Sequence, residues 1–233
     1  KNAVDLDTAN ELANAFQEFD QSQELSVAVL TGSGNCFCAG ADLKAVSEGR
    51  GNRVELSGDG PMGPTRMLLS KPVIAAVEGF AVAGGLELAV WCDLRVAAEN
   101  AAFGVFCRRW GVPLIDGGTI RLARMIGHSH ALDMILTGRE VSGVEAQSIG
   151  LVNRLVEPGM ALSKAIELAE QIARFPQVCL RSDRMSSYKQ WNLSIEDALL
   201  EETKMGLEVI SSGETLKGAA KFNAGSGRHG KFE

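Results

Sequence analysis

The chain has 233 residues, of which 45% are apolar and 22% are charged, and its formal net charge is −6. This balance is typical of a globular protein and excludes the strongly basic footprint of a nucleic-acid-binding protein. No apolar run approaches the ~20 residues of a membrane span, and the first residues do not resemble a signal peptide. We therefore expect no nucleic-acid partner and no membrane partner.

The five cysteines are scattered and lack the spacing of a metal site, although Cys36 and Cys38 form a C-x-C pair. Reduced thiols are typical of a reducing compartment. We therefore expect no metal, no disulfide and a cytoplasmic location.

The first third of the chain alternates between helix and strand signals. A capping box at 8–11, with Asp7 as the alternative cap, is followed by apolar residues at helical spacing and predicts a helix over about 8–20. The apolar run 25–30 predicts a buried strand, and a small-residue turn at 37–44 follows it. Glycine and proline are spaced through 45–66 in a way that disfavours a long element, so this segment is either a functional loop or a mobile surface insertion.

The centre of the chain reads as strand, glycine-rich turn and helix. The apolar run 72–77 predicts a buried strand, a turn with two adjacent glycines follows, and helix-forming residues begin at Leu86. The remaining predicted elements are strands at 93–98, 103–106 and 152–156, a glycine-rich turn at 116–119 entering a helix, and helices at about 160–173, 177–189, 194–211 and 213–223.

Strand signals end near Pro158, and only helical patterns follow. Several short strands end beside an acidic residue, an irregular recurrence that favours a spiral of strand and helix turns over a doubly wound sheet. We expect an α/β core over 1–158 and a helical region over 159–233.

Two small-residue turns are candidates for binding an oxyanion. The first spans 39–42, and the second contains Gly84 and Gly85; each follows a predicted strand and precedes a predicted helix. Backbone N–H groups at a helix start have no intrahelical partner, and the helix dipole adds positive charge there. One N–H from each turn would form a two-donor oxyanion hole, or the glycines only permit tight packing.

Two carboxylates lie beside these glycine-rich turns. Glu87 follows Gly84 by three residues and has apolar neighbours, which favours burial and a raised pKa suited to acid–base work. Its alternative role is to stabilise the helix dipole. Asp116 precedes two glycines and a threonine, and its alternative role is to cap the next helix.

Several motifs, taken together and in order, identify a family. They are NCFCAGADL at 35–43, KPVIAAVEG at 71–79 with GGLEL at 84–88, GGTIRL at 117–122, and TGR at 137–139 with AQSIGLV at 146–152. This combination covers nearly the whole chain and resembles the crotonase (enoyl-CoA hydratase/isomerase) superfamily.

The resemblance implies a ββα-spiral core with a C-terminal helical trimerisation region, assembled as a homotrimer or a dimer of trimers. It implies an acyl-CoA thioester substrate whose thioester oxygen accepts hydrogen bonds from the N–H groups of Ala41 and Gly84. Coenzyme A is then part of the substrate, and no further cofactor is implied. Full-length members carry a first strand before the position of Asn2, so we expect that strand to precede Lys1. The residues implied to bind coenzyme A are Ala39, Asp42, Leu43, Lys44, Phe222 and Lys231.

The chain departs from the family pattern at one catalytic position. Glu87 matches the first of two glutamates that family hydratases carry, but Cys107 occupies the position of the second. Members similar to dienoyl-CoA isomerase place an aspartate where Asp116 stands, three residues before Thr119. The resemblance therefore implies Glu87 and Asp116 as the catalytic pair.

Three functions are compatible with these residues. The first is an enoyl-CoA hydratase-like lyase, and the second is an enoyl- or dienoyl-CoA isomerase that uses Glu87 and Asp116 without water. The third is an acyl-CoA-binding protein with impaired catalysis, which the cysteine at 107 would explain.

Overall fold

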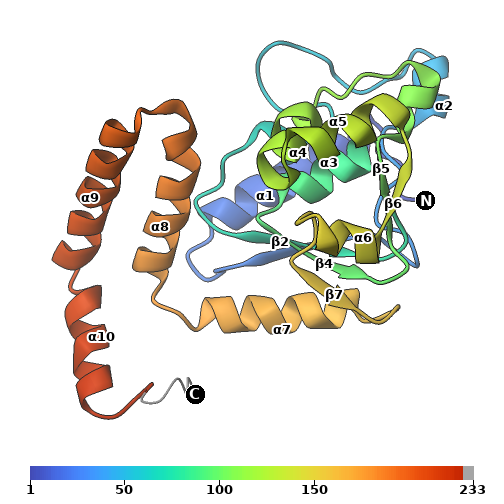
Figure 1. Cartoon of the computed structure of the whole chain (residues 1–233). Coiled ribbons are helices and arrows are strands. Elements are labelled where there is room, and N and C mark those ends of the chain that lie inside the picture. Colours follow the sequence, from blue (N-terminus) through green and yellow to red (C-terminus); the bar gives the residue numbers. More distant parts are fainter. Residues whose placement is uncertain (228–233) are drawn as a thin grey trace. The chain divides into compact units, whose positions relative to one another are not determined.

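Figure 1 shows the computed structural model of the chain, which describes residues 1–227. The chain divides into two compact units, Lys1–Glu170 and Gln171–Glu233. Within the described range, every helix is too short or too polar to cross a membrane.

The first unit contains a parallel four-stranded sheet. Its strand order is β1-β2-β4-β7, and each strand runs parallel to its neighbours. The strands are β1 (Ala28–Thr31), β2 (Val73–Val77), β4 (Leu94–Ala98) and β7 (Arg154–Val156). All five residues of β2 are buried, as its continuous run of valine, isoleucine and alanine predicts for a central strand of a parallel sheet.

The second sheet contains three strands, in the order β3-β5-β6. β3 (Phe80–Val82) runs parallel to β5 (Ala102–Gly104), and β6 (Glu140–Ser142) runs antiparallel to β5. The successive pairs β2–β3 and β4–β5 thus each pass from the first sheet to the second. This repeated passage places the turn after β3 beside the segment that follows β1.

The helices of the first unit connect these strands. They are α1 (Leu6–Gln21), α2 (Leu43–Ser47), η1 (Pro64–Arg66), α3 (Gly84–Trp91), η2 (Phe106–Trp110), α4 (Gly118–Ile126), α5 (His128–Thr137), α6 (Gly143–Ser148) and the start of α7 (Ala161–Ala173).

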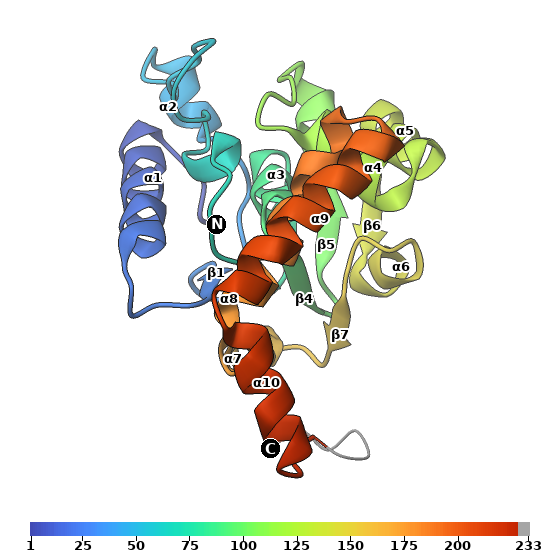
Figure 2. The same ribbon diagram turned by 90° about the vertical axis from the view of Figure 1, so that its left-hand side faces the viewer.

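Helix α3 is the buried centre of the first unit, because all eight of its residues are buried. Figure 2 shows it between α1 and α4. On the α1 side, the rings of Phe16 and Trp91 meet edge to face at 4.8 Å between their centroids. A helix that is apolar all round is expected to be enclosed in this way.

The carbonyl end of α3 is covered by a buried arginine. Arg95 is 3% exposed, and its guanidinium donates hydrogen bonds to the carbonyl oxygens of Ala89 at 3.2 Å, Cys92 at 2.8 Å and Leu151 at 2.6 Å. The bonds to Ala89 and Cys92 satisfy carbonyls at the end of α3 that a buried helix would otherwise leave without partners.

The second unit consists of helices. α8 (Gln177–Lys189) and α9 (Ile195–Ser211) lie side by side (Figure 1), joined through the short η3 (Gln190–Asn192), and α10 (Glu214–Asn223) follows. Val209 is the only buried apolar residue in the described part of this unit. Its more exposed apolar side chains include Ile195, Leu199, Leu207, Ile210 and Leu216.

The predicted α/β class is confirmed, and the predicted long elements overlap α1, β1, β2, α3, β4 and the helices after residue 160. The strand predicted as buried over 25–30 is β1, which begins only at Ala28 and has no fully buried residue. The short elements β3, β6, α5 and α6 were not predicted. The first compact unit continues through Glu170, because Ala161 and Ala165 of α7 are fully buried. The functional division placed after Pro158 stays a prediction.

Candidate active site

A cavity of about 650 Å³ in the first unit brings together the two small-residue turns and both predicted carboxylates. Ala41, Gly84, Glu87 and Asp116 all line it. Most of the remaining wall is apolar and comes from Met62, Phe106, Trp110, Val112 and Ile115, among others. A largely apolar pocket with a few convergent polar groups is the usual form of a small-molecule site.

Backbone hydrogen bonds hold the two turns together. The Cys38 N–H donates to the Phe80 carbonyl oxygen at 2.9 Å, and the Val82 N–H donates to the Cys38 carbonyl oxygen at 3.1 Å. The approach requires glycine, because a Cβ on Gly85 would lie 2.1 Å from the Cys38 carbonyl oxygen. The two turns therefore lie next to each other, as the sequence predicted.

The N–H groups of Ala41 and Gly84 are available for a ligand. Neither donates a hydrogen bond to any residue in the described part of the chain. The two turns also approach closely here, since a Cβ on Gly40 would lie 3.0 Å from the Gly84 nitrogen. Ala83, just before Gly84, has a φ of +53°, which is a strained value for a residue with a side chain.

Glu87 is 2% exposed and is held by the start of α4. Its Oε1 accepts hydrogen bonds from the N–H of Asp116 at 2.9 Å and of Gly118 at 2.8 Å. Burial raises the pKa of Glu87 to about 7, and the hydrogen bond from Gly118 opposes this rise. The carboxyl is therefore close to half protonated at neutral pH.

Asp116 is 4% exposed and does not cap the helix that follows it. Helix α4 has Gly117 at its N-cap position and no side-chain cap, so the capping interpretation is wrong. Instead, Asp116 Oδ1 accepts hydrogen bonds from the Met62 N–H at 3.0 Å and from the Thr65 hydroxyl. Burial raises the pKa of Asp116, while the bonds from Thr65 and Met62 lower it.

The two carboxylates share one arrangement. Each uses a single oxygen, Oε1 of Glu87 or Oδ1 of Asp116, to accept its hydrogen bonds. The other oxygens, Oε2 and Oδ2, accept none from residues 1–227. Since both residues line the cavity, these second oxygens are the ones left for a substrate.

Arg121 joins the segments that carry the carboxylate partners. Its guanidinium donates to the Asp116 carbonyl oxygen at 2.8 Å and to the Thr65 carbonyl oxygen at 2.7 Å. Sequence reasoning missed Met62, Thr65 and Arg121 as residues that position the site. Met62 and Thr65 lie in the segment 45–66, which carries no periodic signal, and Arg121 was noted only as part of a motif.

Cys107 in η2 also lines the cavity and is 6% exposed. Burial and then the negative charge of Glu87 raise the pKa of its thiol. The thiol therefore stays protonated at neutral pH and is a poor nucleophile and a poor acid.

The residues implied to bind coenzyme A lie in different parts of the chain. Ala39 and Leu43 line the cavity, whereas Asp42 caps α2, accepting from the N–H of Lys44 at 2.9 Å. Phe222 belongs to α10 of the second unit and is exposed. Lys231 lies outside the described residues.

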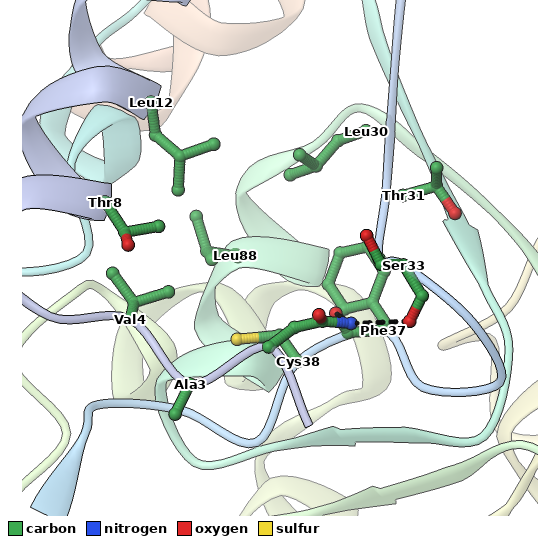
Figure 3. A pocket seen from close by; sticks show the side chains of 12 residues that line it. Ala3, Val4, Thr8, Leu12, Leu30, Thr31, Ser33, Phe37, Cys38 and Leu88 are labelled. Carbon is green, nitrogen blue, oxygen red and sulfur yellow. Dashed lines mark hydrogen bonds between the residues drawn. The ribbon is translucent and has the colours of Figure 1, made fainter.

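A second, smaller cavity of about 310 Å³ lies behind the first turn and is shown in Figure 3. Val4, Leu12, Leu30, Phe37 and Leu88 give it apolar walls. Its one titratable lining group is the thiol of Cys38, whose pKa burial raises to about 11. This cavity therefore has no group suited to acid–base chemistry near neutral pH.

Comparisons with known proteins identify the family of this chain. Residues 1–224 match the family model described as enoyl-CoA hydratase/isomerase. The enoyl-CoA hydratase EchA19 of Mycobacterium tuberculosis is 36% identical over 234 residues, covering 95% of this chain and 85% of the relative. The mevalonyl-coenzyme A hydratase sidH of Aspergillus fumigatus is 37% identical over 201 residues, covering 85% of this chain and 74% of the relative.

A solved structure also matches the chain closely. The crystal structure of an enoyl-CoA hydratase from Mycobacterium tuberculosis H37Rv superimposes with a TM-score of 0.90 and is 39% identical in sequence. The match covers 95% of this chain and 87% of that one. The chain therefore belongs to the enoyl-CoA hydratase/isomerase family of acyl-CoA enzymes, within the crotonase superfamily.

Proposed function

We propose that this protein is a hydratase-type lyase that adds water reversibly across the C2–C3 double bond of an enoyl-CoA thioester. One observation carries the proposal: Glu87 and Asp116 line a single cavity, and each keeps one carboxylate oxygen without a described hydrogen-bond donor. The printed names of the two relatives, both hydratases, support the same reaction class.

The thioester oxygen would accept hydrogen bonds from the N–H groups of Ala41 and Gly84. These groups line the cavity and have no acceptor among the described residues. They would stabilise the negative charge that develops on this oxygen when a nucleophile adds at C3. One donor of this kind contributes roughly 3 kcal/mol to transition-state stabilisation.

Proton transfer would involve both carboxyl groups. One carboxylate takes a proton from water as the water oxygen bonds to C3, and the C2–C3 π electrons move into the thioester as an enolate. The other carboxyl gives its proton to C2 as the enolate collapses. A pKa of about 7 lets Glu87 serve as acid or as base near neutral pH.

Asp116 would take the place of the second glutamate of family hydratases. Cys107 stands at that glutamate's position, but burial keeps its thiol protonated and so unsuited to the role. Asp116 lines the same cavity and is linked to Glu87 by its own N–H. Close positioning of two such groups is the main requirement of this reaction.

The coenzyme A arm would lie along Ala39, Asp42, Leu43 and Lys44. Phe222 and Lys231 would reach the coenzyme from a neighbouring copy in a homotrimer or a dimer of trimers. Exposed apolar side chains on α9 and α10 support the C-terminal helices as the trimerisation region. Coenzyme A would enter as part of the substrate, with no further cofactor, and the enzyme would act in the cytoplasm.

Isomerisation of an enoyl- or dienoyl-CoA is the second candidate, and the cysteine at position 107 favours it. In that reaction one carboxylate removes a proton from carbon and a proton returns at a different carbon. The same Glu87 and Asp116 would suffice, and no water would be incorporated.

Heavy-oxygen water separates these reactions. The protein is incubated with crotonyl-CoA and with longer 2- and 3-enoyl-CoAs in H₂¹⁸O, and the products are analysed by mass spectrometry. We expect an ¹⁸O-labelled 3-hydroxyacyl-CoA. A shifted double bond without label would replace hydration by isomerisation, and tight CoA-ester binding without turnover would indicate a binding protein.

A further inference from the structure

The segment that leads into η1 is tied to the Asp116 side chain. The Met62 N–H and the Thr65 hydroxyl both donate to Oδ1 of Asp116. Thr65 is 1% exposed, so its hydroxyl is shielded from bulk solvent. A buried hydroxyl that donates to a candidate catalytic carboxylate can fix the orientation of that carboxylate.

We infer that Thr65 is a positioning residue, which orients the Asp116 carboxylate for proton transfer through its side-chain hydroxyl. The inference rests on the proposed function, because it assigns a role to Asp116 in the reaction. With two donors fixed on Oδ1, rotation of the carboxylate is restricted and Oδ2 stays available for the substrate. Thr65 itself need not touch the substrate.

The surroundings of this hydrogen bond leave little room for another arrangement. A Cβ on Gly60 would lie 2.0 Å from the Thr65 hydroxyl oxygen and 2.8 Å from Asp116 Oδ1. Glycine at position 60 therefore allows the hydroxyl and the carboxylate to meet. A longer side chain there would displace both groups.

The backbone at this place is held independently of the hydroxyl. Arg121 bridges the carbonyl oxygens of Thr65 and Asp116, at 2.7 Å and 2.8 Å from its guanidinium nitrogens. Loss of the Thr65 hydroxyl would therefore leave the two segments joined. The effect of such a loss should be confined to the orientation and the proton affinity of the carboxylate.

Several charged or titratable groups face Asp116 from the elements around it. They are Glu87 from α3, Arg66 from η1, Arg121 from α4 and the Cys107 thiol from η2. Arg66 and Arg121 lower the pKa of Asp116, as does the bond from Thr65. Removing the hydroxyl takes away one group that stabilises the ionised form, so the pKa of Asp116 should rise.

The test compares Thr65→Val with Thr65→Ser and with a matched control, Thr31→Val. Thr31 lies on β1 and donates its hydroxyl to the Ala76 carbonyl oxygen at 3.0 Å, and it does not line the 650 Å³ cavity. The kcat and KM for the best enoyl-CoA substrate are measured from pH 5 to pH 10, with circular dichroism to verify folding.

We expect Thr65→Val to lower kcat by about tenfold or more while KM changes by less than about threefold. The limb of the pH profile that reports Asp116 should move to higher pH, because the pKa of Asp116 rises. Thr65→Ser should restore both the rate and the profile, and Thr31→Val should behave as the wild type.

Two further variants separate a loss of folding and a purely structural role from the proposed role of Thr65. If Thr65→Val does not fold, Thr65→Ala replaces it with the same expectations. In an Asp116→Asn background, Thr65→Val should change the residual kcat by less than about twofold, because the hydroxyl acts through the carboxylate.

The inference is overturned if Thr65→Val keeps the wild-type rate and profile, or if it slows the Asp116→Asn variant as much as the wild type. Full activity of Asp116→Asn itself would instead overturn the proposed catalytic pair.

Discussion

Replacing Glu87 by glutamine removes a buried negative charge while keeping the side-chain shape. The amide oxygen of glutamine can still accept the two hydrogen bonds that Oε1 receives from the N–H groups of Asp116 and Gly118. The variant should therefore fold, bind CoA esters nearly as well as the wild type, and lose turnover. It should also be more stable than the wild type at alkaline pH.

The magnitude of this stabilisation follows from the pKa of Glu87. Burial raises that pKa from 4.5 to about 7, so the protonated form is favoured in the folded state. A group of this kind supports folding fully below its unfolded pKa, and the support is lost as pH rises through the folded pKa. The raised pKa of Glu87 thus lowers the free energy of unfolding by about 3 kcal/mol at pH 8, but by less than about 1 kcal/mol at pH 5.

Urea unfolding of the wild type and of Glu87→Gln at pH 5 and pH 8 measures this difference. We expect the variant to gain about 2 kcal/mol more over the wild type at pH 8 than at pH 5. A useful contrast is Glu145→Gln, because the hydrogen bond from Arg139 lowers the pKa of Glu145. That substitution should cost more stability at pH 8 than at acid pH. An equal gain for Glu87→Gln at both pH values would refute the assignment of a raised pKa.

Three further predictions concern the catalytic side chains, two glycines and the backbone at Ala83. Asp116→Asn should lower kcat by about 10²–10⁴-fold in a turnover assay, whereas Cys107→Ala should keep kcat within about tenfold, because its protonated thiol has no role in the proton transfers. Gly85→Ala should lower the free energy of unfolding by about 3 kcal/mol, because its Cβ would lie 2.1 Å from a backbone carbonyl oxygen. Gly206→Ala should raise the free energy of unfolding by about 0.5–1 kcal/mol in the same urea titration, because no atom lies within 4 Å of the added Cβ. Ala83→Gly should raise the free energy of unfolding by about 1 kcal/mol, because glycine adopts a φ of +53° without strain. A loss of stability would show that the strain on Ala83 is smaller than the entropy cost of glycine.

The elements predicted well are those with long local patterns. Helix α1 follows from its apolar spacing, and β2 follows from an unbroken apolar run. The predicted capping box at 8–11 is wrong, because α1 begins at Leu6 and its cap is Asp5, whose carboxylate accepts a hydrogen bond from the Thr8 N–H. β3 and β6 have three residues each, so no periodicity could reveal them. They are strands only because β5 lies between them.

The candidate active site also has features that the sequence predicts and features that it does not. The adjacency of the turns at Ala41 and Gly84 could be inferred, because each follows a strand and begins a helix. The hydrogen bond from Thr65 to Asp116 could not be inferred, since 51 residues separate them and the segment 45–66, which contains Thr65, has no periodic signal. Sequence alone also left Asp116 as a possible helix cap, and only the positions of its hydrogen-bond donors decide against that.

Arg95 has a consequence for the opposite end of α3. The helix is eight residues long, so its termini are about 12 Å apart, and all of it is buried where water screens charge weakly. A guanidinium on the terminal carbonyls offsets the negative pole of the helix dipole. The positive pole at Gly84 then keeps more of its field, which Glu87 in the first turn opposes only in its ionised form. A residue remote from the reacting atoms thus contributes to the field in which the thioester oxygen would gain its charge.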